Sequence, residues 1–323
     1  MRAIAVSALR AEPGLMEVPK PDPGPGEVRV KIEYAALNPL DWQTADGTLG
    51  GGAEQVFPLV LGVDFAGRVD MIGSGDNRFR VGDPVFGHVP VFGDTTVRPF
   101  GQGTYCEYVC VPQDSPIAPV PDGLTLQTAA ALPCAGTAAA RILAVAEAAS
   151  ARSLLVIGAA GGVGSCLTQL AAARGIQVVA AVRGDEEKRM EALGAALTVD
   201  TTTRPDALDS AVRSLCPEGA DALADLASAG PATFAAHCAS VRVGGVALST
   251  RGAGAQGSAD PAGVTCAEFR LDPAPELLGS LATRVTRARL HVPIEIELPL
   301  EKAPQSLAQN RAGGARGKTV FTL

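Results

Sequence analysis

Aromatic and basic residues are both scarce in this chain of 323 residues. Aromatic side chains make up 4% of it, and 27 Lys and Arg residues stand against 34 Asp and Glu, a formal net charge of −7. Proteins that bind nucleic acid ordinarily present a basic stripe and aromatic platforms for base stacking. With 47% apolar residues, the composition is that of a globular protein, and it excludes nucleic acid as an expected partner.

Long apolar runs and paired cysteines are missing as well. No run reaches the roughly 20 apolar residues that a membrane-spanning helix needs. The first residues are interrupted by Arg10, Glu12 and Pro13, a pattern typical of a first strand and not of a secretory signal. The seven cysteines are an odd number without a C-x-x-C pair, which indicates free thiols in a reducing compartment. We therefore expect a cytoplasmic protein with no membrane partner.

Residues 1–123 contain short alternating runs that are separated by turns rich in Pro and Gly. Examples of the runs are 28–32 and 68–72, and turn signals stand at 23–26 and 73–76. Such alternation with frequent turns predicts an all-β domain, here a partly open barrel.

From residue 124 the pattern changes to Ala-rich helices that alternate with apolar strands. A mostly helical segment spans 125–147, with expected breaks at Pro133 and Gly136. The alternation predicts an α/β domain with a parallel, doubly wound sheet over 124–264. The expected strands are 154–157, 176–182, 196–199, 222–226 and 241–249.

The last segment, 265–323, returns to mixed character. We place this tail back on the first domain, which it would complete. Its expected elements are a helix at 275–287, a strand at 293–298, a helix at 304–310 and a strand at 318–323.

The stretch 153–174 (SLLVIGAAGGVGSCLTQLAAAR) predicts a buried strand, a glycine turn and a helix. In this context the glycines indicate a dinucleotide site: Gly161 lets the backbone approach a pyrophosphate, and Gly164 lets the helix pack closely on the strand. Ala159 stands where the usual first glycine would be, so glycines that serve packing alone are the alternative. The expected backbone contacts to the cofactor are Ala160, Gly161, Gly162, Val163 and Gly164.

The choice of cofactor is predicted from the end of the second strand, 176–182. An acidic residue there would bind the ribose 2′-hydroxyl of NAD, but the place carries Arg183, with Lys188 one helical turn further on. Arg presents a planar fork of donors that suits a phosphate, so the two cations predict a 2′-phosphate and hence NADPH. The acids at 185–187 oppose this unless they form the first turn of a helix. The alternative is that both cations belong to an ordinary solvated helix start.

Seven short pieces, spread in order over the chain, carry a family resemblance: 25–30 (PGEVRV), 36–42 (ALNPLDW), 61–67 (LGVDFAG), 81–87 (VGDPVFG), 103–108 (GTYCEY), 159–164 (AAGGVG) and 317–320 (GKTV). The chain resembles the medium-chain dehydrogenases/reductases, in the zinc-free quinone-oxidoreductase (zeta-crystallin-like) branch. The resemblance implies a GroES-like β-barrel domain, a Rossmann domain that binds NADPH, and an active site in the cleft between them. It also implies a homodimer that pairs Rossmann sheets edge to edge, with 241–249 as the expected edge strand.

Within this resemblance, zinc is not expected. Zinc-dependent members carry a Cys near the place of Asn38, a His where Val63 follows Gly62, and a later lobe of four cysteines, whereas Cys106 and Cys110 have no further cysteines nearby. A zinc site takes about four N or S ligands, and no such set can be assembled. The histidines are scattered and are expected to be surface or hydrogen-bonded structural residues: His88, His237 and His291.

Without a metal, the implied chemistry is hydride transfer to an acceptor whose anion is delocalised, a quinone or a conjugated enone. The resemblance places Asn38 near the nicotinamide and the substrate, where it would donate to the developing oxyanion; a turn residue is the alternative. Asp41 is expected to be a structural or capping acid. The loop 44–49 lacks the Tyr that related enoyl-thioester reductases carry, so Tyr34, Tyr105 or water would have to deliver the proton.

Further cofactor contacts follow by position. Thr137 matches a family residue near the nicotinamide, or else caps a helix. Ligands of open α/β sheets lie at the carboxyl ends of the strands. This predicts contacts from the residues that follow the fourth and fifth strands: Leu226, Ala227, Ser249 and Thr250.

The leading function is therefore zinc-independent, NADPH-dependent reduction of a small quinone or α,β-unsaturated carbonyl compound. One alternative is an enoyl or ketone reductase that tailors a biosynthetic product. The other is a cofactor-binding protein with little turnover, since a fold does not determine a function. The loops 44–56 and 88–101 carry little chemical signature, so the sequence names neither the substrate nor the proton donor.

Overall fold

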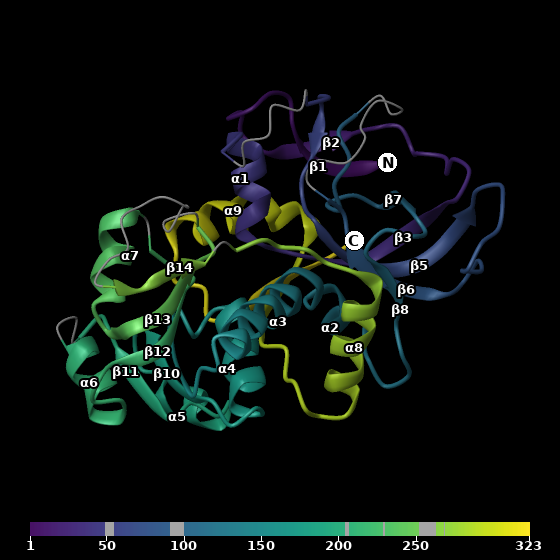
Figure 1. Ribbon diagram of the computed structural model, residues 1–323. Helices are drawn as coiled ribbons and strands as arrows, with labels where there is room; N and C mark the ends of the chain where they lie inside the picture. The colour runs from purple at the N-terminus through teal and green to yellow at the C-terminus, as the bar shows by residue number, and fades with distance from the viewer. Residues whose placement is uncertain (49–54, 91–99, 204–206, 229, 252–262, 268) are drawn as a thin grey trace. The chain divides into compact units, whose positions relative to one another are not determined.

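The computed structural model describes the chain except for residues 49–54, 91–99, 204–206, 229, 252–262 and 268. The loop expected at 50–52 lies outside the described residues. The chain divides into two compact units (Figure 1). Unit 1 comprises Met1–Ala135, Pro273–Gly314 and Lys318–Leu323, and unit 2 comprises Gly136–Asp272 and Ala315–Gly317. The domain bounds expected at 123/124 and 264/265 stay predictions.

Unit 1 is a β structure, as the alternating runs predict. In β3 (Glu27–Ala36), Val28, Val30 and Ile32 are buried in the core and Lys31 is exposed. The smaller sheet has the order β2-β1-β4, with β1 (Arg2–Val6), β2 (Gly14–Glu17) and β4 (Leu59–Val60). The larger has the order β15-β16-β3-β5-β6-β8, with β7 also paired to β3: β5 (Asp64–Ile72), β6 (Pro84–His88), β7 (Tyr108–Pro112), β8 (Ile117–Pro119), β15 (Ile294–Pro299) and β16 (Lys318–Thr322).

The helices of this part of the chain include α1 (Pro39–Asp46), α2 (Leu126–Ala130), α8 (Pro275–Thr286) and α9 (Ala303–Ala312). The break expected at Pro133 is confirmed, because α2 ends before it and α3 (Pro133–Ala148) begins with it. The break expected at Gly136 is wrong, since α3 continues through it. Glycine costs a helix about 1 kcal/mol relative to alanine, and the packing of buried neighbours such as Ala135 and Ile142 outweighs that cost.

Most of the C-terminal tail lies in unit 1, as Pro273–Gly314 and Lys318–Leu323, whereas 265–272 and 315–317 lie in unit 2. Strand β16 pairs antiparallel with β3, with Val320 opposite Ala36, and parallel with β15. This pairing brings Lys318, at the start of β16, to the end of β3 and to Asn38, 280 residues away in the sequence.

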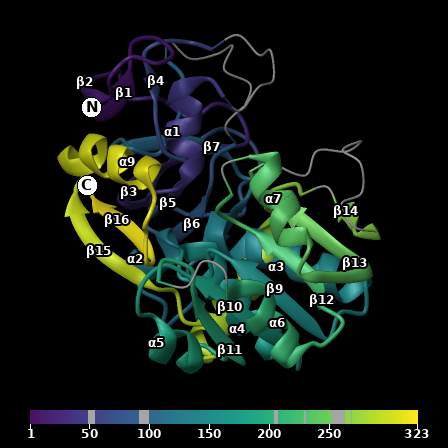
Figure 2. The same ribbon diagram turned by 90° about the vertical axis from the view of Figure 1, so that its left-hand side faces the viewer.

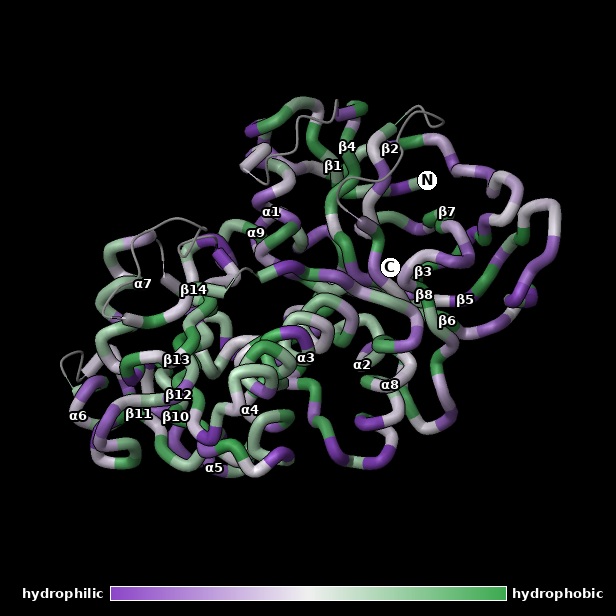
Figure 3. The backbone as a smooth tube through the Cα atoms, in the orientation of Figure 1, coloured by the Kyte–Doolittle hydropathy of each residue, from purple (hydrophilic) through white to green (hydrophobic). Residues whose placement is uncertain are grey.

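Unit 2 contains the predicted parallel sheet. Its strands are parallel and have the order β11-β10-β9-β12-β13-β14, a doubly wound order in which the direction of strand addition reverses between β9 and β12. Helix α4 covers one face, and α6 and α7 cover the other (Figures 1 and 2). Apolar residues concentrate in the strands (Figure 3). The elements are β9 (Ser153–Ile157), α4 (Gly162–Ala172), β10 (Gln177–Val182), α5 (Glu187–Ala192), β11 (Leu197–Asp200), α6 (Leu208–Leu215), β12 (Ala220–Asp225), α7 (Pro231–Cys238), β13 (Val241–Ser249) and β14 (Thr265–Ala267).

The sheet edge differs from the expectation. Strand β13 was the expected edge, but β14 pairs with it from Val246 to Leu248. Three half-exposed residues are too few to make a readable apolar run, which is why β14 is absent from the sequence prediction. The homodimer stays a prediction that light scattering can test. Among the described helices, none combines the length and the apolar character that crossing a bilayer requires.

Candidate nucleotide-binding turn and buried polar network

The turn between β9 and α4 places its glycines for different reasons. Gly158, directly after β9, has φ +80°, a left-handed conformation that favours glycine. In the dinucleotide-binding pattern the first glycine would stand at Ala159. Gly158, one position earlier, provides the glycine of this tight turn instead. A Cβ on Gly164 would lie 2.5 Å from the Cα of Ala159. The close approach predicted between this helix and the strand is thus found between α4 and the turn that follows β9.

Gly161 has another environment. It is the N-cap of α4, with φ −72° and ψ 176°, a conformation open to any residue. Among the described residues, a Cβ there would meet the Gly158 carbonyl oxygen alone, at an ordinary 3.5 Å. Packing within the chain therefore gives no reason for glycine here, whereas a ligand that approaches the backbone does. The first N–H groups of α4 lack intrahelical acceptors and form the positive end of the helix dipole, which fits a pyrophosphate.

Thr137 lies inside α3, four residues after the first residue of that helix, so the helix-cap alternative is wrong. Its side chain is fully buried, and its Oγ1 has no hydrogen-bond partner among the residues that the structure describes. A buried hydroxyl without a partner is costly, and such groups ordinarily find one. Thr137 is thus suited to a polar group of a bound cofactor, and its predicted contact stays a prediction.

The end of β10 clarifies the role of the three acids that follow it. Glu186 is turned inward, 6% exposed, and binds the guanidinium of Arg189 at 2.6 Å and that of Arg316 at 3.0 Å. Arg183 and Lys188 are exposed. The inward carboxylate of Glu186, which by itself would repel a phosphate, is therefore paired with two arginines. The 2′-phosphate contact expected of Arg183 and Lys188 stays a prediction.

The neighbouring turns are fixed by carboxylates at strand ends. Asp200 of β11 accepts hydrogen bonds from the backbone of Thr202 and Gly184, which lower the pKa of its carboxyl group to about 2. Gly184 has φ +82°. Arg189 in turn donates to the carbonyl oxygen of Ala160 at 2.9 Å, so α5 is tied to the glycine turn.

At the end of β12, Asp225 is fully buried and holds the following turn. Its carboxylate accepts from the backbone N–H groups of Ala227 and Ser228 at 3.1 and 2.8 Å and lies 2.9 Å from His237 Nδ1. Burial raises the pKa of this carboxyl group, but the hydrogen bonds from His237 and Ser228 outweigh it and the net shift is downward. The backbone N–H of Thr250 donates to the Asp225 carbonyl oxygen. Predicted contacts from this edge stay predictions: Leu226, Ala227, Ser249 and Thr250.

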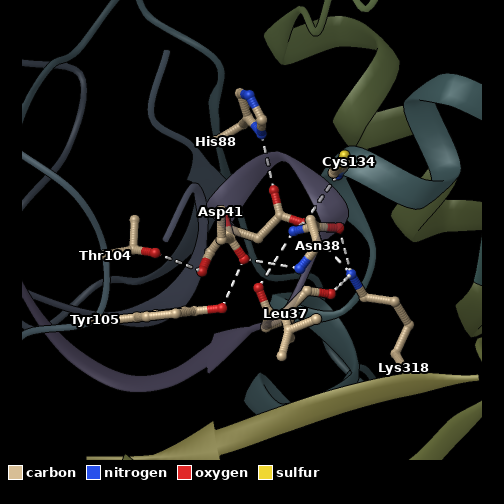
Figure 4. A network of polar contacts seen from close by, with 10 residues as sticks. Leu37, Asn38, Asp41, His88, Thr104, Tyr105, Cys134 and Lys318 are labelled. Carbon is tan, nitrogen blue, oxygen red and sulfur yellow. Dashed lines mark hydrogen bonds and ion pairs between the residues drawn. The ribbon is translucent and has the colours of Figure 1, made fainter. Parts of the chain in front are cut away.

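In unit 1, a network of buried polar side chains surrounds Asn38 (Figure 4). Asn38, 3% exposed, precedes α1. Its Oδ1 accepts from Lys318 Nζ at 2.5 Å, and its Nδ2 donates to Asp64 Oδ2 at 2.9 Å and to the Ala36 carbonyl oxygen at 3.2 Å. Both amide hydrogens are therefore engaged. The oxyanion contact predicted for Asn38 stays a prediction, and it requires release of the longer bond to Ala36.

Asp64 is the centre of this network and is fully buried. Its Oδ1 lies 2.8 Å from His88 Nδ1, and its Oδ2 accepts from Asn38 and from the backbone N–H of Cys134 at 3.1 Å. Lys318 Nζ stands 3.9 Å away, itself 4% exposed. A buried carboxylate is stable when it is paired and hydrogen-bonded, and Lys318 and these donors provide that. The expectation of a hydrogen-bonded structural role is confirmed for His88.

Asp41 caps α1 and is also fully buried. Its Oδ2 accepts from the Asn38 backbone N–H at 2.8 Å and from the Tyr105 hydroxyl at 2.6 Å. Burial raises the pKa of Asp41 to about 7, against the lowering effect of these two hydrogen bonds. The capping role expected of Asp41 is confirmed. Tyr105, fully buried and bonded to Asp41, is not placed to give a proton to a substrate, so that alternative is wrong.

Sequence reasoning did not assign roles to Asp64, Lys318 or Arg316. A signal was present for the first two, because both are charged residues inside pieces of the family pattern, 61–67 and 317–320. A charge in a mostly apolar strand calls for a partner. The identity of the partner depends on strand pairing between distant segments.

The residues of unit 1 do not fit a catalytic zinc. Val63 offers no ligand, and the Asn38 carbonyl oxygen is bound to the ammonium of Lys318. Across the described part of the chain, no three His, Cys, Asp or Glu side chains come together in a way that would hold a metal ion. The absence of stoichiometric zinc stays a prediction, and elemental analysis that finds one zinc per chain would contradict it.

Two family models match the chain in the order of its two folds. "Alcohol dehydrogenase GroES-like domain" matches residues 24–122, and "Zinc-binding dehydrogenase" matches residues 162–271. A chloroplastic quinone-oxidoreductase of Triphysaria versicolor is 28% identical over 317 residues, 94% of this chain and 92% of that protein. A trans-enoyl reductase of Aspergillus japonicus is 30% identical over 200 residues, 59% of this chain and 56% of that protein. This second match spans only about half of the relative.

Solved structures extend the likeness over the whole chain. The quinone oxidoreductase of Coxiella burnetii matches with a TM-score of 0.83 and 25% identity, covering 100% of this chain and 99% of that one. An NAD-dependent alcohol dehydrogenase matches with a TM-score of 0.85 and 28% identity, and a mycobacterial protein complexed with NADPH with 0.83 and 26%, both covering 100% of each chain. The parallel sheet, the returning tail and these matches agree: the chain belongs to the medium-chain dehydrogenase/reductase superfamily, in its quinone-oxidoreductase-like branch.

Proposed function

We propose that the protein is a zinc-independent oxidoreductase that transfers a hydride from NADPH to a quinone or an α,β-unsaturated carbonyl compound. The observation that carries this proposal is the glycine turn before α4. At the N-cap of this helix, a Cβ on Gly161 would meet the Gly158 carbonyl oxygen alone among the described residues, so the packing of these residues does not require a glycine there. An anionic dinucleotide is the ligand that this arrangement suits.

NADPH is proposed over NADH because of the charges at the end of β10. Arg183 and Lys188 are exposed there, and Glu186 is withdrawn into a pair with Arg189 and Arg316. Similar structures differ in their cofactor, since the mycobacterial protein is complexed with NADPH and the alcohol dehydrogenase is NAD-dependent. The comparison therefore does not distinguish NADPH from NADH, and the proposal of NADPH rests on the charges at the end of β10.

The bound nicotinamide supplies the hydride, and the chain supplies position and hydrogen bonds. Thr137 offers a buried hydroxyl, and Asn38 offers an amide whose orientation is set by Lys318 on one side and Asp64 on the other. A quinone or enone needs no metal to accept a hydride, because its product anion is delocalised. Donors already in place for that anion avoid reorganisation during the reaction.

The proton that completes the reduction is proposed to come from water. Tyr105 is committed to Asp41 in the interior, and Tyr34 lies half-buried in β3. The related loop position, 44–49, carries no Tyr. An enoyl or ketone reductase is the second candidate, supported by the likeness to the trans-enoyl reductase of Aspergillus japonicus.

The test follows NADPH oxidation with a panel of quinones, enones, enoyl thioesters and simple ketones. Turnover of quinones or enones supports the proposal, and turnover confined to enoyl thioesters or ketones supports the second candidate. Tight binding of NADPH without turnover of any acceptor would instead indicate a cofactor-binding protein. Binding of neither NADPH nor NADH overturns the proposal altogether.

A further inference from the structure

A short segment of the C-terminal tail contributes one cation to the end of β10. Residues Ala315–Gly317 belong to unit 2, although the segments on both sides of them belong to unit 1. In that segment, Arg316 reaches the residues that follow β10. Its Nε lies 3.0 Å from Glu186 Oε1, and its side chain is 57% exposed.

Gly184 makes room for this arginine. A Cβ on Gly184 would lie 3.0 Å from Arg316 Nη2, a close contact with the end of that side chain. The residue also has φ +82°, and its N–H donates to Asp200 at 2.9 Å. The guanidinium of Arg316 therefore lies close to Gly184, the residue that directly follows Arg183.

Glu186 holds the arrangement in place. Its buried carboxylate binds Arg189 through one oxygen and Arg316 through the other. One inward carboxylate thus stands against two guanidinium groups, and Arg183 and Lys188 add two further cations at the same strand end. Asp200, at the end of the neighbouring strand β11, accepts hydrogen bonds from Gly184, Thr202 and Thr203.

We propose that Arg316 is a specificity-determining residue that binds the 2′-phosphate of NADPH together with Arg183. This rests on the proposed function, because the ribose of the cofactor must lie at the end of the second strand of the sheet, β10. Guanidinium groups bind phosphate through paired, charge-assisted hydrogen bonds, and two of them from different segments would enclose a dianion. Glu186 is the positioning residue that directs Arg316.

The experiment measures dissociation constants of NADPH and NADH, and of 2′,5′-ADP and 5′-AMP, by calorimetry. The proteins are wild type, Arg316→Gln, Arg316→Lys and the control Arg311→Gln. Arg311 lies in the same tail, exposed, and pairs with Asp46 in unit 1. Arg316→Gln is expected to weaken NADPH and 2′,5′-ADP on the order of tenfold, with NADH and 5′-AMP unchanged. Arg316→Lys should lie between, and Arg311→Gln should match wild type.

An equal loss for the phosphorylated and unphosphorylated ligands would overturn the proposal, since it would mean that Arg316 only supports the fold. Unchanged binding of NADPH in both Arg316 variants would overturn it too. These outcomes differ from failure of the proposed function, in which wild-type protein binds neither NADPH nor NADH. If Arg316→Gln does not fold, the ratio of the two cofactors in Arg316→Lys decides.

Discussion

The charged side chains around Asn38 in unit 1 differ in exposure from those at the end of β10 in unit 2. In unit 1, Asp64, Lys318 and Asp41 are at most 4% exposed, and each of them is hydrogen-bonded to Asn38. At the end of β10 in unit 2, Arg183 and Lys188 are exposed, while Glu186 is turned inward. The buried charges of unit 1 set the orientation of an amide, whereas the exposed charges of unit 2 are available to a ligand.

Buried charged residues can orient other side chains of a site, whereas exposed residues can contact a ligand directly. Asn38 lies in the family pattern and looks like a binding residue, yet its amide is bonded on every side within the network. Gly161 has no side chain at all, and its contribution is the space that it leaves. Substitutions in the two units should therefore fail differently, one set in stability and the other in ligand affinity.

The largest effect is expected for Lys318→Met. Removing this lysine deprives the buried Asp64 carboxylate of its nearby cation and the Asn38 Oδ1 of its donor, and breaking one side of a buried ion pair costs about 3–5 kcal/mol. Urea unfolding should show this loss in the free energy of unfolding. Lys302→Met, an exposed lysine in the same tail, is the control and should change it by less than about 0.5 kcal/mol. A small loss in the free energy of unfolding for Lys318→Met would contradict the view that the buried charges of unit 1 act mainly on stability.

The next effect concerns Asp41 and pH. The pKa of this acid is raised from 3.8 to about 7 in the folded protein, so the folded state binds more protons than the unfolded state between these values. Stability should fall as pH rises from about 4 to 7, and three pKa units at 1.36 kcal/mol each set a limit of about 4 kcal/mol. Asp41→Asn, which keeps an acceptor oxygen, should flatten this decline.

Unfolding by urea across that pH range measures the effect. Asp76→Asn, at an exposed position of unit 1, is the matched control and should leave the slope as in wild type. An unaltered slope in Asp41→Asn would show that another group carries the pH dependence.

Gly161→Val should affect binding and not folding. The backbone conformation there is open to valine, and a Cβ meets no close neighbour among the described residues. We expect binding of both NADPH and NADH to weaken on the order of a hundredfold, about 2.7 kcal/mol, because the side chain fills the space in front of α4. Gly14→Val, in the open strand β2, is the control. Unchanged affinity would indicate that the glycine turn does not face the cofactor.

The smallest effect is expected for Arg183→Ala. Loss of one exposed phosphate contact should weaken NADPH roughly tenfold, or ~1.4 kcal/mol, and leave NADH almost unchanged. Titration of both cofactors tests this, with Arg152→Ala, at the other end of the sheet before β9, as control. Equal losses for both cofactors would mean that Arg183 stacks on the adenine or supports the fold. A wild-type preference for NADH would reject the NADPH assignment.

Most of the fold could be predicted because its elements have local signatures. The strands of unit 2 are short, mostly apolar runs, and they lie within two residues of their predicted positions, from β9 to β13. The exceptions were β14, too short for a pattern, and Gly136, where a glycine stays helical because its neighbours are buried. In both cases packing decided what local propensity did not.

What the sequence by itself determined is the order of elements, the two folds and the glycine turn, since these follow from periodicity and from residues adjacent in the chain. Only the tertiary structure decided which charges meet. Strand pairing brings Lys318 to Asn38 over 280 residues, and the excursion of 315–317 brings Arg316 to Gly184. The inward turn of Glu186 likewise depends on these partners. A buried charge needs a partner of opposite sign, but its own segment does not say where in the chain that partner lies.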